Sequence, residues 1–262
     1  MNKISLQMYT LREFTKTPAD LAKTLERLRE IGFEWVQFTI PTTWDAHLTK
    51  RIFDDAGLRD DSVFCSCLDL EERTSEIIAQ SDLFGTDFIR MDSIPGGLSG
   101  TAAGYKMFAH YLNEVGAAYK SAGKTLLYHF HAFEFIGLGS TTGIEILLSE
   151  TDPEILQIIP DTHWIQSGGR DPERFLEKYR DRYQYMHAKD FAIGKMGATW
   201  EARPIKFAPV GEGNLDWNGI LSACRSNNVL SYAIEQDDCY GRDPFDCVKS
   251  SFDFMMKMGV NE

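Results

Sequence analysis

The chain has 262 residues, of which 43% are hydrophobic and 25% are charged, and its formal net charge at pH 7 is -12. These values are typical of a globular enzyme, and α/β barrels routinely reach this length as one domain. The acidic balance disfavours nucleic acid and anionic membranes as partners, since both are bound mainly through Lys and Arg, but a phosphorylated substrate would need only one local basic group.

Strand patterns and helical patterns alternate along the chain. The expected strands cover residues 3–9, 35–40, 62–68 and 88–91, and then lie near 125–130, 155–160, 183–187 and 230–235. The expected helices cover residues 18–31, 44–56, 73–84 and about 101–122, and then lie near 142–150, 171–180, 217–227 and 244–258. Thr17 and Pro18 suit the start of the first helix, and Gly32 suits its end.

This alternation indicates parallel βαβ units, and eight of them predict a closed (β/α)8 barrel, the TIM barrel. No linker or low-complexity run separates a second part, so we expect residues 1–262 to form a single domain. The segment from Asp190 to Asp216, which contains Trp200, Arg203 and Lys206, is too long for a simple βα loop. Loops of that length without structure of their own are usually functional lids.

Four expected strands in the second half lead into side chains that can bind a metal ion. The stretch YHFHAFEF, residues 128–135, contains two histidines and Glu134, and the three later runs end at Asp161, His187 and Glu235. The first two intervals are 27 and 26 residues, and the third is 48, which fits one unit plus the long segment. Because active-site residues of a barrel come from the carboxyl ends of its strands, we expect these four side chains to share one mouth.

Three carboxylates and one imidazole suit a single divalent ion, namely Mn²⁺, Zn²⁺, Co²⁺ or Mg²⁺. Such an ion acidifies the carbon-bound proton beside a carbonyl and stabilises the enediolate that forms when the proton leaves. Carboxylates on either side can take and return that proton. We therefore predict Glu134 and Glu235 as catalytic metal ligands, with Asp161 and His187 anchoring the metal.

Four further side chains are candidates for substrate contact: His129, His131, Trp164 and Lys189. Simpler structural roles stay open for several residues of the site. Lys189 could serve simply as an ion-pair partner of Glu235, and Trp164 could pack against the barrel rim. Asp161 could cap the following loop, since Asp is a common turn former.

The motifs LQMYTLRE, YHFHAFEF, PDTHW, MHAKD, PVGEGNLDW and YAIEQDD together resemble the sugar phosphate isomerase/epimerase family, xylose isomerase-like barrels that include inosose isomerases and dehydratases. The resemblance runs nearly from end to end, in matching order. It implies that the metal is held by a glutamate of the second motif, the aspartate of DxxW, the histidine of HxKD and the glutamate of EQD. These positions are Glu134, Asp161, His187 and Glu235. The family usually has His-Asn-His where this chain has Phe130 between its two histidines.

We therefore predict an enzyme of carbohydrate metabolism, a metal-dependent isomerase or epimerase of a keto-sugar, sugar phosphate or keto-inositol. A lyase, such as a dehydratase of a keto-polyol, would use the same stabilised enolate and stays open. A nuclease needs more metal ligands and a basic groove, which six histidines and the net charge disfavour. A non-catalytic sugar-sensing barrel is a third class, and the presence of both glutamates disfavours it.

The expected surroundings follow from the same sequence. It has no apolar run of membrane-spanning length, and the start MNKISLQMYTLREF lacks a signal peptide's apolar region. Five cysteines without framework spacing favour a reduced, cytoplasmic protein. We expect no membrane partner, and homo-oligomers, which the ends of such barrels often support, stay open.

Overall fold

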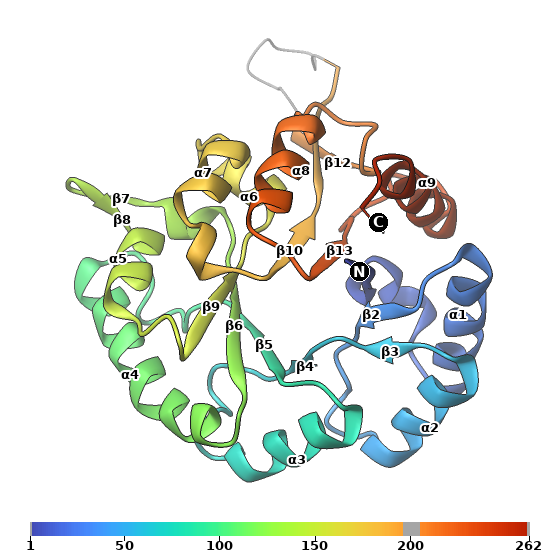
Figure 1. Ribbon diagram of the computed structural model, residues 1–262, viewed down its shortest axis with the longest axis horizontal. Helices are drawn as coiled ribbons and strands as arrows, with labels where there is room; N and C mark the ends of the chain where they lie inside the picture. The colour runs from blue at the N-terminus through green and yellow to red at the C-terminus, as the bar shows by residue number, and fades with distance from the viewer. Residues whose placement is uncertain (1, 196–204, 261–262) are drawn as a thin grey trace.

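The computed structural model describes residues 2–195 and 205–260 of the chain. Parallel strands lie in the centre and helices surround them, which confirms the predicted (β/α)8 barrel (Figure 1). One run of neighbouring strands has the order β4-β5-β6-β9 and another has the order β10-β13-β1-β2-β3. A parallel bridge between Asp161 and His187 connects the two runs. In the described part of the chain, no helix combines the length and the apolar character needed to cross a membrane.

The barrel strands lie where the sequence places them except β3, which precedes the expected range 62–68, and most are shorter than expected. They are β1 (Lys3–Gln7), β2 (Trp35–Gln37), β3 (Arg59–Asp60), β4 (Val63–Phe64), β5 (Phe88–Asp92), β6 (Thr125–His129), β9 (Leu156–Ile159), β10 (Tyr185–Ala188) and β13 (Ser231–Ile234). The third strand position is split, because β3 pairs with β2 whereas β4 pairs with β5.

The helices that surround the barrel also agree with the predicted ranges within a few residues. They are α1 (Pro18–Ile31), α2 (Ala46–Ala56), α3 (Thr74–Phe84), α4 (Ala102–Ser121), α5 (Gly143–Glu150), α7 (Pro172–Lys178), α8 (Trp217–Ser226) and α9 (Pro244–Lys257). Thr17 caps α1 as expected, since its side chain accepts a hydrogen bond from the Asp20 N–H at 3.1 Å. Gly32 ends this helix at a φ of 121°, a conformation that L side chains rarely adopt.

Several short elements were not expected from the sequence. They are the 3-10 helices η1 (Met8–Phe14), η2 (Ala132–Phe135) and η3 (Arg180–Arg182), the helix α6 (Thr162–Ser167), and the hairpin of β7 (Gly137–Leu138) and β8 (Thr141–Thr142). Two of them, η2 and α6, directly follow barrel strands β6 and β9. They therefore determine where side chains beyond those strand ends are directed.

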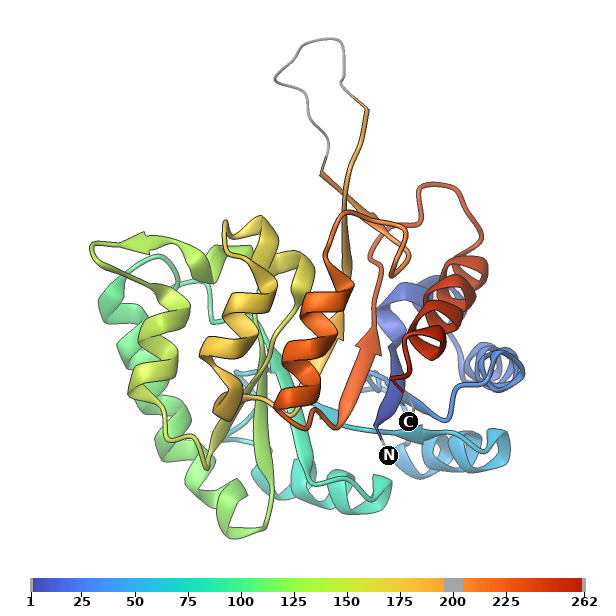
Figure 2. The same cartoon turned by 45° about the horizontal axis from the view of Figure 1, so that its top comes forward.

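The long segment after β10 has its own secondary structure, contrary to the expectation of an unstructured lid. Strands β11 (Asp190–Ile193) and β12 (Ile205–Ala208) pair antiparallel and project from one end of the barrel (Figure 2). The Asp190 carboxylate fixes the base of this segment, because Oδ2 accepts from the Gly211 and Gly213 N–H groups and from Trp217 Nε1, at 2.8, 3.0 and 2.8 Å. Lys206 lies in β12, while Trp200 and Arg203 lie outside the described residues.

The barrel interior changes from apolar to polar toward the carboxyl ends of the strands. Leu127, Ile159 and Tyr185 pack together in an apolar layer with Phe88. Since every second residue of a strand faces the same side, the residues two positions further on form the next layer. These are His129, His187 and Arg90 on their strands and Asp161 just beyond the end of β9. The strand period alone therefore places chemically reactive groups at one end of the barrel.

Candidate active site

Four buried side chains meet at the carboxyl ends of the strands, and we call them the four-residue group. They are His129, Asp161, His187 and Glu235, each at most 5% exposed. One nitrogen or carboxylate oxygen from each residue lies within 4.8 Å of those of the others, so that the group could hold a metal ion. Three of its members are predicted ligands, and His129 was expected only as a substrate contact.

Glu134, the fourth predicted ligand, is not a member of this group. The chain leaves β6 at His129 and turns into η2, where Glu134 is fully buried. Its carboxylate accepts hydrogen bonds from Tyr128 Oη at 2.5 Å and from the His131 N–H at 2.8 Å. Burial raises the pKa of Glu134 to about 7. His129, as the last residue of the strand, takes the position in the group that the sequence analysis gave to Glu134.

His187 presents a lone pair to the centre of the group. Its Nε2 lies 2.8 Å from the amide oxygen of Gln37, an arrangement that suits donation from Nε2–H and leaves the Nδ1 lone pair for the group. Nδ1 lies 3.0 Å from Glu235 Oε2 and 4.0 Å from Asp161 Oδ2, which are also acceptors. Among the described residues, neither His187 Nδ1 nor Glu235 Oε2 forms a hydrogen bond of ordinary geometry, although both are buried and the Lys189 ammonium lies 3.2 Å from Glu235 Oε2. Buried acceptors that converge in this way need a cation or donor between them.

Asp161 has the simpler role that the sequence left open, a cap, and it also faces the four-residue group. Its Oδ1 accepts a hydrogen bond from the Trp164 N–H at 3.0 Å and so caps helix α6. Its Oδ2 faces the group and lies 3.2 Å from His129 Nε2. Burial raises the pKa of Asp161, and this effect is opposed mainly by Lys189.

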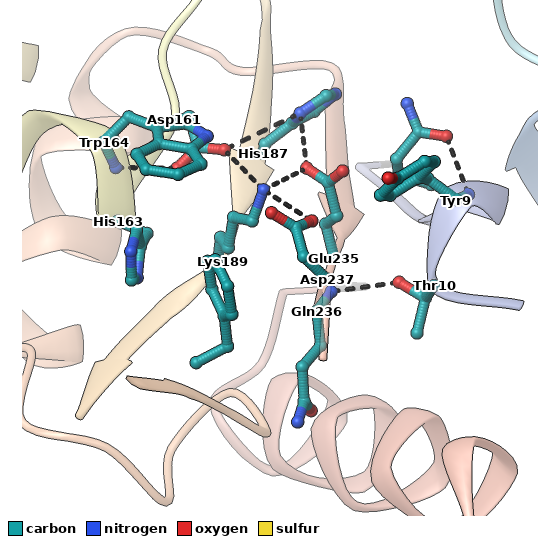
Figure 3. A network of polar contacts seen from close by, with 12 residues as sticks. Tyr9, Thr10, Asp161, His163, Trp164, His187, Lys189, Glu235, Gln236 and Asp237 are labelled. Atoms are coloured by element: carbon teal, nitrogen blue, oxygen red, sulfur yellow. Dashed lines mark hydrogen bonds and ion pairs between the residues drawn. The ribbon is translucent and has the colours of Figure 1, made fainter. Parts of the chain in front are cut away.

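Lys189 supplies positive charge beside the group and is 1% exposed. Its Nζ lies 2.8 Å from Asp237 Oδ1, 3.2 Å from Glu235 Oε2 and 3.6 Å from Asp161 Oδ2 (Figure 3). Burial alone would lower the pKa of Lys189, but these carboxylates outweigh it and raise the pKa. In return, Lys189 and then His187 hold the pKa of Glu235 well below its usual range, against the effect of burial. The ammonium is therefore one partner of a charge network around the predicted ligands.

A cavity of about 320 Å³ adjoins the group. Its wall includes His129, His131, Lys189 and Glu235, and also Arg90 and Asp92. Burial, followed by the neighbouring His187 and His131, lowers the pKa of His129 well below its usual range, so its imidazole is neutral. A neutral imidazole and an ionised carboxylate on one cavity wall can bind a cation or exchange protons with a small molecule.

Trp164 lies beside the cavity residues rather than in their wall. The centre of a Trp164 ring is 5.0 Å from Lys189 Nζ and 5.4 Å from the His131 ring centre. It therefore packs next to two of the predicted substrate contacts, which agrees with either role considered for it.

Sequence reasoning missed three polar residues near the group: Gln37, Arg90 and Asp92. Two of them had a visible signal, because Arg90 and Asp92 occupy alternate positions in FIRMD, a short strand with apolar residues between them. Gln37 gave no comparable signal, since its partner lies on a strand 150 residues away.

Comparisons with known proteins agree with this architecture. Residues 25–257 match the family described as xylose isomerase-like TIM barrel. An inosose dehydratase of Clostridium beijerinckii is 26% identical over 161 residues, which cover 58% of this chain and 52% of that protein. The chain thus spans about half the length of the curated relatives it matches.

Two solved structures show the same fold over the whole chain. A sugar phosphate isomerase/epimerase from Parabacteroides distasonis has a TM-score of 0.81 at 23% identity, covering 100% of this chain and 96% of its own. A xylose isomerase-like TIM barrel protein from Mycobacterium smegmatis, solved in complex with magnesium, has a TM-score of 0.74 at 14% identity, covering 100% and 97%.

Proposed function

The chain belongs to the xylose isomerase-like TIM barrel family, and from this membership and its site we propose a divalent-metal-dependent isomerase or epimerase of a keto-sugar or keto-polyol. The observation that carries the proposal is the four-residue group, in which two imidazoles and two carboxylates, all buried, each bring one ligand atom within 4.8 Å of the others. Such a group beside a cavity of about 320 Å³ suits a small, oxygen-rich substrate.

The proposed metal ligands are His129, Asp161, His187 and Glu235, which revises the predicted set by exchanging Glu134 for His129. Two imidazoles and two carboxylates suit Mn²⁺, Zn²⁺ or Co²⁺, and Mg²⁺ with more of its sites taken by water. The Gln37 amide supports this assignment, because ligating histidines commonly donate their second N–H to an acceptor. The magnesium found with the Mycobacterium smegmatis protein is consistent with such a site.

When bound, a divalent ion would polarise the substrate carbonyl and make the neighbouring C–H more acidic. Glu235 is both a group member and part of the cavity wall, so its carboxylate is placed to take that proton. Lys189 keeps its ammonium charged and can donate a hydrogen bond to the oxygen on which negative charge develops. His131 also lines the cavity, and its imidazole can return a proton at the neighbouring carbon.

A dehydratase is the second candidate, and the position of Glu134 favours it. An epimerase needs proton-transferring groups on both faces of one carbon. The Glu134 carboxylate accepts hydrogen bonds from Tyr128 Oη and the His131 N–H, and Glu235 is the glutamate of the predicted pair that lines the cavity. A dehydratase would use Glu235 as base and Lys189 or His131 to protonate the departing hydroxyl. The similarity to inosose dehydratases supports this alternative.

The test is solvent hydrogen exchange, which both reactions share. The manganese-loaded protein is incubated in D2O with a panel of ketoses and inososes, and deuterium next to the carbonyl is followed by NMR. We expect Glu235→Gln to slow exchange by about a hundredfold or more, whereas the matched surface variant Glu177→Gln leaves it unchanged. Exchange at the wild-type rate in Glu235→Gln, or no exchange with any compound, would contradict the proposal. Loss of a hydroxyl from the product distinguishes dehydration from isomerisation.

A further inference from the structure

Arg90 is a buried charge that the proposed reaction does not use. It lies in the middle of β5 between Ile89 and Met91, is 2% exposed, and forms part of the wall of the cavity beside the four-residue group. A buried guanidinium is costly unless acceptors surround it, since it always stays charged and carries five N–H donors. The protein's own acceptors should therefore account for this side chain.

The protein's own acceptors satisfy few of the N–H donors of Arg90. Arg90 Nη2 donates one long hydrogen bond to Thr39 Oγ1 at 3.5 Å. Its Nε is buried and has no hydrogen-bond partner among the described residues. Its other close neighbour is an aromatic face, because the guanidinium carbon lies 5.0 Å from the centre of the Phe64 ring. Thr39 and Phe64 belong to the same cavity wall, so the guanidinium is held at the edge of the space that a substrate would enter.

No nearby carboxyl group of the described residues forms an ion pair with Arg90. Asp60 and Arg90 influence each other electrostatically, but the two side chains form no ion pair, and Asp60 Oδ1 instead accepts from the Phe38 N–H at 3.2 Å. Burial, together with Asp61, raises the pKa of Asp60 well above its usual range, which favours the neutral acid. Asp92 lines the cavity two residues further on, and within the described ranges it too forms no ion pair with Arg90.

Lys189 offers a useful contrast within the same cavity. Its ammonium has three carboxylate oxygens within 3.6 Å, so its charge is compensated by the protein. Arg90 has no such set, although both side chains are equally buried and line the same space. The difference indicates that the compensating charge for Arg90 comes from outside the chain.

We propose that Arg90 binds an anionic group of the substrate, a carboxylate or a phosphate, within this cavity. This inference rests on the proposed function, because that proposal identifies the cavity as the substrate site. The fork of guanidinium N–H donors matches the paired oxygens of either anion, which is why Arg is preferred over Lys in such sites. The substrate class is thus narrowed from any keto-sugar or keto-polyol to one that carries an acid group.

The test compares binding of three probes that share a ketohexose skeleton: D-fructose, D-fructose 6-phosphate and 2-keto-D-gluconate. Dissociation constants are measured by calorimetry for the wild type, Arg90→Met, Arg90→Lys and the exposed α2 control Arg51→Met, with manganese and after chelation. Circular dichroism establishes that each variant is folded. We expect the wild type and Arg51→Met to bind one anionic probe about tenfold or more tightly than fructose. Arg90→Met should lose that preference while keeping its affinity for fructose, and Arg90→Lys should keep part of it.

A preference for the phosphate or for the carboxylate distinguishes the two sources of the anion. Equal binding of neutral and anionic probes by the wild type, no binding of either anionic probe, or an unchanged preference in Arg90→Met would each overturn the inference. If Arg90 had a purely structural role, Arg90→Met would bind all three probes more weakly or would unfold. Arg90→Lys would then behave no better than Arg90→Met. Because the readout is binding, a protein without exchange activity refutes the proposed function and leaves this measurement intact.

Discussion

Replacing Lys189 by Met should destabilise the metal-free protein strongly, because it removes a buried positive charge and leaves the carboxylates around it. Lys189 Nζ lies 2.8, 3.2 and 3.6 Å from oxygens of Asp237, Glu235 and Asp161. With an effective dielectric constant of about 20, each contact is worth roughly 5 kcal/mol of Coulomb energy. The cost of desolvating the ammonium offsets a large part of the summed Coulomb energy. In the variant, protonation of one carboxyl would relieve some of the repulsion between the remaining carboxylates.

The net loss for Lys189→Met is therefore expected to be about 3–5 kcal/mol in the free energy of unfolding. Saturating Mn²⁺ should recover part of it, because a bound cation replaces the missing charge and stabilises the folded state by mass action. The stabilisation that Mn²⁺ gives should thus be larger in Lys189→Met than in the wild type. The same comparison tests whether the ammonium and the proposed metal share one electrostatic environment.

Urea denaturation with and without Mn²⁺ measures both quantities. The matched control is Lys249→Met, whose ion pair with Asp253 at 2.6 Å is exposed and should change the free energy of unfolding by less than about 1 kcal/mol. A loss below about 1 kcal/mol for Lys189→Met in the chelated protein would refute the reasoning. So would a stabilisation by Mn²⁺ that is equal in the variant and the wild type.

Two further predictions concern residues that the sequence analysis missed or placed differently. Gln37→Leu removes the acceptor of the His187 Nε2–H, so affinity for Mn²⁺ measured by calorimetry should fall about 10–100-fold, and an unchanged affinity would show that Gln37 does not orient the ligand. Burial raises the folded-state pKa of Glu134 to about 7, so the folded state retains a proton that the unfolded chain loses from about pH 4.5 upward. Stability should therefore fall by about 3 kcal/mol as pH rises through that window, and denaturation curves of Glu134→Gln should lack this component if Glu134 causes it.

The sequence allowed the barrel and most element positions to be predicted, because strand and helix periods alternate regularly. Helix ends were predictable where a local signal exists, as at Thr17 and Gly32. The split of the third strand and the pairing of β11 with β12 were not predictable, since both depend on pairing between residues distant along the chain. Short helices such as η2 and α6 carry too few residues to show a period.

Three of the predicted ligands come together because each lies at or directly after a strand end, where residue spacing fixes position. Glu134 does not join them, since it lies five residues beyond the end of β6 and the chain turns before reaching it. Counting by strand period from Leu127 favours His129 instead, because the two residues face the same side of β6. In YHFHAFEF, the strand period thus accounts for the presence of His129, and not Glu134, in the four-residue group.

Calorimetric titration of the chelated protein with Mn²⁺ tests the central claim, that one cation is bound by side chains from the last four strands of the barrel. We predict one ion per chain for the wild type and loss of that binding in Asp161→Asn. This variant keeps an oxygen to accept the Trp164 N–H and cap α6, but removes the charge that faces the group. A wild type that binds no Mn²⁺, or a folded Asp161→Asn variant that binds it as tightly as the wild type, would contradict the claim.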